Sequence, residues 1–284
     1  MQSRWADRDA KAAVDLYGRV GVAPELALRI YTTRLLGSDR KLVLHGGGNS
    51  SVKMRMKDLV GDEVDVLCVK GTGSDMAEAD ASSMVAVRLA PLLKLRTWND
   101  LSDDEMARVQ RAHLIDPMAP SPSLELLLHA FVPHKYVDHT HATALLSLID
   151  QPNGPDIAHE VYGDTLGIVP YVRPGFGLAK ASANTFDSNP KVRGLILDKH
   201  GIFTFGETAR ESYARMIALV TEAEEYLAKH GAWNLAAVAP NAGAAPKKEE
   251  IATLRREISS VMGAPAILTV HDDPAGRAFA QRAD

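Results

Sequence analysis

The chain has 284 residues, of which 46% are hydrophobic and 24% are charged, a composition typical of a globular protein with a packed core. Its net charge of −4 excludes the strongly basic surface that attracts nucleic acid or anionic membranes. No segment approaches the ~20 apolar residues of a membrane span, the charged N-terminus does not resemble a signal peptide, and the single cysteine, Cys68, predicts a reducing, cytoplasmic location.

The first third of the chain predicts two helices and then three strands. The helices cover residues 7–19 and 25–36, and the strands cover residues 42–44, 52–57 and 64–70. Pro24 lies in the first helical turn, where proline is tolerated, and Gly37 ends this second helix. Apolar and charged residues alternate in the second strand, which we expect to pair with the third strand as a hairpin.

The remainder of the chain alternates between helices and strands. A capping box begins at Ser102 and predicts a helix to about His113, and Ser123 caps a short helix that carries Glu125. Strands are expected over residues 136–142, 166–172, 194–198 and 202–205, followed by a long helix over 207–229. Short hairpins outnumber strand–helix–strand crossovers, so we predict an α/β protein with a central, mostly antiparallel sheet flanked by helices.

The composition also divides the chain. Residues 234–246 are rich in alanine, proline, glycine and asparagine, which is typical of a linker. We therefore expect a main domain over residues 1–233 and a C-terminal extension over 247–284. The extension is predicted to contain a helix at about 247–261 and a strand at 266–270.

Three histidines are the strongest functional signal. His139 and His141 are two residues apart in a predicted strand, so their rings should point the same way. His200 precedes a glycine at the end of another strand. A single histidine is usually a surface or hydrogen-bonded core residue, but three imidazoles around one point make a divalent-metal site with an open position. Zinc, manganese, cobalt and iron all suit such ligands.

Glu125 is surrounded by leucines in its predicted helix. A carboxylate in an apolar setting has a raised pKa, which suits a general base near neutral pH. The alternative is a solvated glutamate favoured by the helix dipole. His129 lies four residues later, so we expect it on the same helix face, within hydrogen-bonding reach of Glu125.

Two glycine-containing loops are candidate anion sites. In the loop over residues 45–51, Gly48 lets a ligand approach the main chain, and Asn49 and Ser50 add side-chain contacts. The loop lacks the third glycine of a dinucleotide-binding fingerprint and the Gly-Lys-Ser/Thr of a Walker loop. An ordinary tight turn is the alternative.

The second loop covers residues 70–76, where a strand ends and a helix is expected to begin. Thr72, Gly73 and Ser74 are candidates to bind a phosphate at that helix N-terminus, with added charge from Lys70. The alternative is that Ser74 or Asp75 simply caps the helix.

In combination, these motifs resemble the class II aldolase/adducin family of sugar-phosphate aldolases. The resemblance covers roughly residues 20–230 and rests on five ordered motifs. They are HGGGNSS at 45–51, GTG at 71–73, PSLE at 122–125, HTH at 139–141 and HG at 200–201. Residues 26–37, 135–141 and 201–206 are most similar to the aldolase half of bifunctional rhamnulose-1-phosphate aldolase/alcohol dehydrogenase proteins. In those proteins a short-chain dehydrogenase domain follows, and the 284 residues contain no glycine fingerprint for one.

The resemblance implies a three-layer α/β/α fold and roles for individual residues. It implies that His139, His141 and His200 bind a divalent metal, most commonly Zn²⁺, and that Glu125 is the acid/base. It also implies a phosphate pocket lined by Asn49, Thr72, Gly73 and Ser123. Relatives often carry two small hydroxyl residues before the glutamate, whereas this chain has Ser123 and then Leu124, which leaves one phosphate contact unassigned.

The implied activity is metal-dependent retro-aldol cleavage of a ketose 1-phosphate, similar to rhamnulose 1-phosphate, to dihydroxyacetone phosphate and an aldehyde. The resemblance also implies a homotetramer. Two alternatives remain open: a sugar-phosphate epimerase or dehydratase that uses the same metal, and a non-catalytic, adducin-like binding module.

Overall fold

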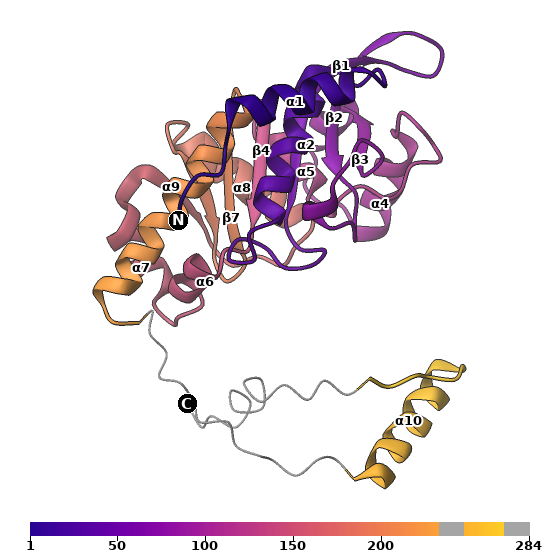
Figure 1. Ribbon diagram of the computed structural model, residues 1–284, viewed down its shortest axis with the longest axis vertical. Coiled ribbons are helices and arrows are strands. Elements are labelled where there is room, and N and C mark those ends of the chain that lie inside the picture. Colours follow the sequence, from indigo (N-terminus) through magenta and orange to yellow (C-terminus); the bar gives the residue numbers. More distant parts are fainter. Residues whose placement is uncertain (233–246, 270–284) are drawn as a thin grey trace. The chain divides into compact units, whose positions relative to one another are not determined.

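The computed structural model describes residues 1–232 and 247–269. The chain divides into two compact units, Met1–Gly231 and Ala232–Asp284 (Figure 1). The first unit contains the whole sheet and the helices that cover it. In the second, the described residues form one helix, α10 (Lys248–Met262). The expected linker over 234–246 lies outside the described residues.

The first unit is built on a seven-stranded sheet with the order β3-β2-β1-β4-β7-β6-β5. The strands are β1 (Asn49–Lys57), β2 (Glu63–Lys70), β3 (Met84–Arg88), β4 (Tyr136–Thr140), β5 (Leu166–Val169), β6 (Gly194–Leu197) and β7 (Gly201–Gly206). Every neighbouring pair is antiparallel except β5 and β6, which run parallel. The predicted α/β class and mostly antiparallel sheet are therefore confirmed, as is the hairpin of β1 and β2, in which Ser51 lies opposite Val69.

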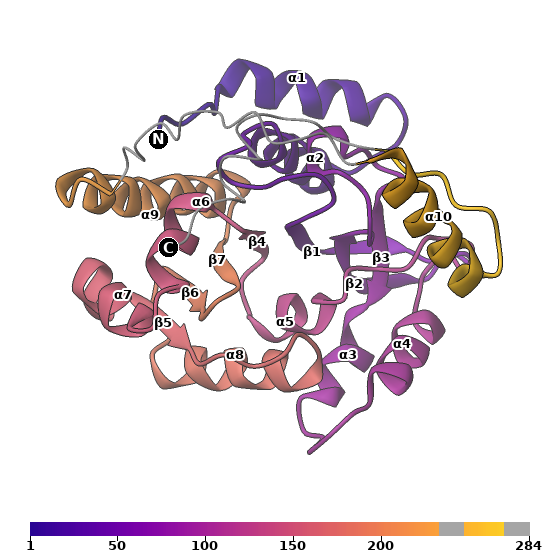
Figure 2. The ribbon, with the colours of Figure 1, turned by 90° about the horizontal axis from the view of Figure 1, so that it is seen from below.

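Helices cover both faces of this sheet, which gives three layers (Figure 2). They are α1 (Asp7–Gly18), α2 (Pro24–Gly37), α3 (Leu89–Leu95), α4 (Asp103–Ala112), α5 (Leu126–Phe131), α6 (Thr143–Ile149), α7 (Gly154–Tyr162), α8 (Phe176–Ser188) and α9 (Ala209–Lys229), with short 3₁₀ turns at η1 (Met76–Glu78) and η2 (Gly163–Thr165). Helices α2 and α9 pack on one face, over β1, β4 and β7. Helices α3 and α8 pack on the other, against β2, β5 and β6, and α5 lies between them.

Local sequence signals explain where several helices begin. Ser102 and Glu105 form both hydrogen bonds of the expected capping box at α4. The Thr208 side chain accepts a hydrogen bond from the Glu211 amide at the start of α9, and Pro24 opens α2. The Ser102 and Thr208 side chains satisfy backbone amides that have no partner within the helix, and Pro24 has no amide hydrogen to satisfy.

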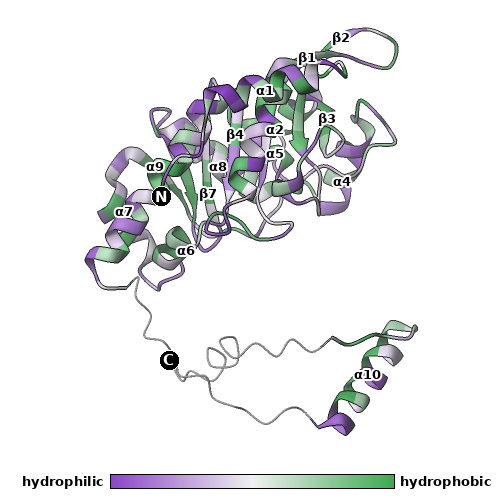
Figure 3. Cartoon of the chain, viewed as in Figure 1, coloured by the Kyte–Doolittle hydropathy of each residue, from purple (hydrophilic) through white to green (hydrophobic). Residues whose placement is uncertain are grey.

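The core is apolar on both sides of the sheet. Alternate residues of β7 face opposite layers, so that Phe203 and Phe205 join one buried cluster and Ile202 joins the other. Figure 3 shows that the strands are largely hydrophobic, whereas the helices carry both kinds of residue. Along the described residues, no helix combines the length and the apolar character that crossing a membrane requires.

Four predicted strands are absent or at least two residues shorter in the structure, β1 begins three residues earlier than predicted, and β3 was not predicted. Residues 42–44 form no strand: Leu42 lies in a turn and residues 43–44 are irregular, although Leu42 and Val43 are buried. The strand expected over 136–142 ends at Thr140, and the one expected over 166–172 ends at Val169. Residues 266–269 form no strand, and Val270 lies outside the described residues.

Candidate metal centre and active site

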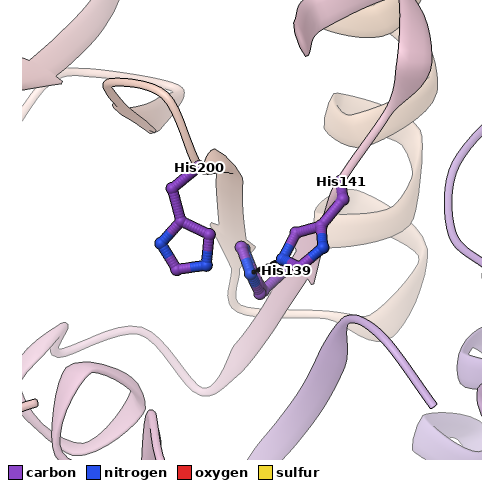
Figure 4. A group of neighbouring side chains, drawn as sticks. All are labelled: His139, His141 and His200. Carbon is purple, nitrogen blue, oxygen red and sulfur yellow. Dashed lines mark hydrogen bonds between the residues drawn. The ribbon is translucent and has the colours of Figure 1, made fainter. Parts of the chain in front are cut away.

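The three predicted histidines meet at one end of the central strands (Figure 4). His139 lies in β4, His141 follows that strand directly, and His200 lies in the turn between β6 and β7. One ring nitrogen from each of the three lies within 4.8 Å of the others. The Nε2 atoms of His139 and His141 are 2.9 Å apart.

The position of β4 explains how His139 is held. The strand lies between β1 and β7, so that His139 is opposite Asn49 on one side and Phe203 on the other. The Phe203 ring stacks on His139 with centroids 4.2 Å apart. The Ile202 carbonyl lies 3.1 Å from His139 Nδ1, and because a carbonyl only accepts, Nδ1 carries the proton. The lone pair of Nε2 is therefore directed to the other two rings.

The charge state of the cluster fits a metal cation. Burial lowers the pKa of His139, His141 and His200, and at His139 the neighbouring imidazoles lower it further. Neutral imidazoles present lone pairs to a cation, and an all-nitrogen set of three suits Zn²⁺ and similar transition metals. On this chemistry the residues present fit a divalent metal.

Glu125 lies immediately before α5 and extends into the same cluster. Its Oε1 lies 3.3 Å from His200 Nε2, and its Oε2 lies 3.4 Å from His139 Nε2. Burial raises the pKa of Glu125, and the nearby His200, the Asn49 hydrogen bond and Lys70 oppose this rise. Its buried Oε1 has no hydrogen-bond partner among the described residues. The carboxylate is thus held beside the imidazoles with one oxygen open to a ligand.

Asn49 connects this carboxylate to Ser123. Its Nδ2 donates to Glu125 Oε2 at 2.6 Å and to Ser123 Oγ at 2.9 Å. The sequence indicated Asn49 only as an anion contact, because its link to Glu125 depends on β1 and β4 lying side by side. The predicted bond between His129 and Glu125 is wrong, because the two ring nitrogens of His129 pair with Ser51 and Asn49.

A cavity of about 250 Å³ opens beside the histidines. It is lined by Gly46, Gly47, Gly48, Asn49, Lys70, Gly71, Thr72, Gly73, Ser123, Leu124, Glu125, His141, Pro174 and His200. The two glycine loops touch there, since a Cβ on Gly46 would lie 3.3 Å from the Gly73 carbonyl oxygen. Gly48 has a φ of 62°, and a Cβ there would lie 2.9 Å from the His139 carbonyl oxygen, so only glycine fits.

Two expected contacts do not line this cavity. Ser50 is fully buried and pairs with Thr33 of α2, because successive strand residues point to opposite faces and Asn49 faces the cavity. The Ser74 hydroxyl donates to the Gly71 carbonyl within its own loop. Asp75 caps the following 3₁₀ turn by accepting from Ala77, as the capping alternative predicted.

Comparisons with known proteins agree with this geometry. The sequence profile described as "Class II Aldolase and Adducin N-terminal domain" matches residues 28–227. The N-terminal class II aldolase domain of a conserved protein from Thermoplasma acidophilum is 36% identical with a TM-score of 0.70, covering 80% of this chain and 99% of that one. A sugar-phosphate aldolase from Thermotoga maritima has a TM-score of 0.55 at 17% identity. The match covers 73% of this chain and 96% of that one, and it shows a similarity of fold.

A curated relative is longer than this chain. The Bacillus subtilis protein named "Uncharacterized oxidoreductase YuxG" is 41% identical over 198 residues, which are 70% of this chain and 29% of that protein. The chain therefore spans less than a third of the length of this relative.

Proposed function

The chain belongs to the class II aldolase and adducin family, and from this premise we propose that it is a metal-dependent lyase that cleaves a ketose 1-phosphate by a retro-aldol reaction. The products would be dihydroxyacetone phosphate and an aldehyde such as lactaldehyde. A substrate similar to rhamnulose 1-phosphate follows from the motifs shared with rhamnulose-1-phosphate aldolases.

One observation carries this proposal: the three imidazoles converge at the edge of a cavity that also contains a buried carboxylate. His139, His141 and His200 would hold the divalent metal, which we propose is Zn²⁺. When bound, the metal supplies Lewis-acid stabilisation of the negative charge that develops on the carbonyl fragment. A non-catalytic binding module has no need for a carboxylate enclosed beside three neutral imidazoles.

Glu125 would move the protons. Cleavage of the C3–C4 bond begins with removal of the proton from the C4 hydroxyl, and a base with a raised pKa suits this step near neutral pH. Oε1, which has no hydrogen-bond partner among the described residues, is the atom that would accept that proton. The same carboxyl group, once protonated, can return the proton to the carbon fragment.

The two glycine loops would bind the phosphate. Gly48 and Gly73 line the cavity without a side chain of their own, and Thr72 and Ser123 line the same cavity. The Thr72 hydroxyl donates to the Pro122 carbonyl and so ties its loop to the segment before Glu125. We also propose a homotetramer, as the family resemblance implies, and a cytoplasmic location, as the single cysteine predicts.

The test is a cleavage assay that couples release of dihydroxyacetone phosphate to its reduction, performed on metal-replete protein with a panel of ketose 1-phosphates. We expect turnover, about one divalent metal per chain, and loss of both in His139→Ala. Product analysis separates cleavage from epimerisation or dehydration. Wild-type protein that holds no stoichiometric metal and releases no aldehyde would refute the proposal.

A further inference from the structure

His129 is a buried residue that the proposed reaction does not use directly. It lies in α5, one turn after Glu125, and its side chain is fully buried. Its Nε2 lies 2.5 Å from Asn49 Oδ1, and its Nδ1 lies 2.8 Å from Ser51 Oγ. Asn49 in turn donates to Glu125 and Ser123. A continuous chain of hydrogen bonds therefore runs from His129 through Asn49 to the carboxylate.

From this geometry we propose that His129 is a positioning residue, whose Nε2–H fixes the amide orientation of Asn49 so that both amide hydrogens face Ser123 and Glu125. The inference rests on the proposed function, because it assigns His129 the task of holding the acid/base in its working position. His129 itself is not among the residues that line the cavity.

The proton positions follow from elementary hydrogen-bond rules. An amide oxygen only accepts, so His129 Nε2 must donate to Asn49 Oδ1. A neutral imidazole has one N–H, which leaves Nδ1 to accept the hydroxyl hydrogen of Ser51. With the amide reversed, Asn49 Oδ1 would lie against Glu125 Oε2, and two oxygens without a hydrogen between them repel. The tautomer of His129 thus selects which way Asn49 faces.

The ring of His129 is held from two further directions. Phe203 packs edge-on against it with centroids 5.2 Å apart, and the same Phe203 ring stacks on His139. The His129 carbonyl accepts from Lys53 Nζ at 2.7 Å, which anchors the backbone of α5 to β1. The ring therefore has one orientation available in this packing.

Two substitutions separate positioning from packing. His129→Gln places an amide nitrogen near the position of Nε2 and can still donate to Asn49, whereas His129→Asn reaches only as far as Nδ1 and leaves Asn49 Oδ1 without a donor. We expect kcat of His129→Asn to fall about 10-fold to 100-fold with KM and metal content within about 2-fold. His129→Gln should recover most of that loss. His159→Asn, at an exposed histidine of α7, is the matched control and should behave as wild type.

A measurement on the wild type tests the same point without activity. The ¹⁵N spectrum of histidine-labelled, metal-loaded protein should contain the signals of a buried neutral histidine protonated at Nε2. These signals should be missing from the spectrum of His129→Gln. A ring protonated at Nδ1, or equal loss of kcat in the Gln and Asn variants, would overturn the proposal. Absence of cleavage in the wild type would refute the proposed reaction instead, and the tautomer would still decide the positioning role.

Discussion

Within residues 1–232 and 247–269, no Lys or Arg side chain forms an ion pair with Glu125, and its partners are neutral imidazoles and the Asn49 amide. We predict that Glu125→Gln lowers the cleavage rate by about 10²-fold to 10⁴-fold, because an amide cannot accept the proton. The metal content should remain close to one per chain, because all three histidines are retained. Assays of turnover and metal content on the same preparation test this.

Glu207→Gln is the matched control for this variant, since that carboxylate is 69% exposed. It should keep the wild-type rate. Full activity in Glu125→Gln would remove Glu125 from the reaction and leave the proton transfers to another group.

The sequence predicted which residues form much of the site, but it predicted little of how their side chains are oriented. The spacing of His139 and His141 placed both rings at one point, although His141 lies just beyond its strand. Ser50 and His129 were misplaced for physical reasons that only the tertiary structure reveals. Strand alternation turns Ser50 toward α2, and Glu125 precedes α5 rather than lying within it, so the helical spacing to His129 does not bring their side chains together.

At the scale of the elements, Gly201 at the start of β7 lies directly against the metal centre. A Cβ there would lie 2.5 Å from the Thr140 carbonyl oxygen and 3.0 Å and 3.1 Å from ring atoms of His139 and His141. We predict that Gly201→Ala destabilises the fold by about 1–3 kcal/mol, because backbone must move. It should also weaken metal binding, because both rings are displaced. Urea unfolding and metal titration measure the two effects.

Gly177 of α8 provides the control for that substitution. Its Cβ would meet only Val172 Cγ1, at an ordinary 3.5 Å, so Gly177→Ala should keep wild-type metal affinity. If Gly201→Ala binds metal as tightly as Gly177→Ala, the close packing of β7 against the histidines is not needed for the site.

The turn between β1 and β2 gives a prediction for acid stability. Asp58 accepts from the Val60 and Asp62 amides and from Arg88, and the Arg88 hydrogen bond is the main cause that lowers the Asp58 pKa below 3.8. The unfolded chain therefore takes up this proton first as the pH falls. The stabilisation is present above about pH 4 and is lost as the pH falls through the folded-state pKa.

We accordingly expect Asp58→Asn to unfold at a lower temperature than wild type at pH 7 and to lose less stability between pH 7 and pH 3. Asparagine retains an acceptor for the two amides but removes the ion pair with Arg88. Thermal unfolding followed by circular dichroism at both values tests this. If the unfolding temperatures of wild type and Asp58→Asn fall by the same amount between pH 7 and pH 3, Asp58 does not contribute to acid unfolding.

Element prediction succeeded where a local signal was strong. The capping box of α4, Pro24 at α2 and the alternation in β1 all mark real elements. The strand predicted over 42–44 is absent, because a short apolar run indicates burial and not an extended backbone. Leu42 enters the core from a turn and Val43 from irregular chain. Strand β3 and helices α3, α6, α7 and α8 were not predicted. The parallel pairing of β5 and β6 is a long-range feature that no local pattern reveals.

At the scale of the whole molecule, every residue of the candidate site belongs to the unit Met1–Gly231, together with all seven strands. Helix α10 in the other unit has no buried residue. We therefore predict that a chain ending at Ala232 binds about one metal per chain and unfolds within a few degrees of the full chain. Metal analysis and calorimetry on the shortened and the full chain test this. The His139→Ala variant of each serves as the metal-free reference. Loss of metal from the shortened wild type, with its helical and strand content intact, would mean that residues 233–284 contribute to the site.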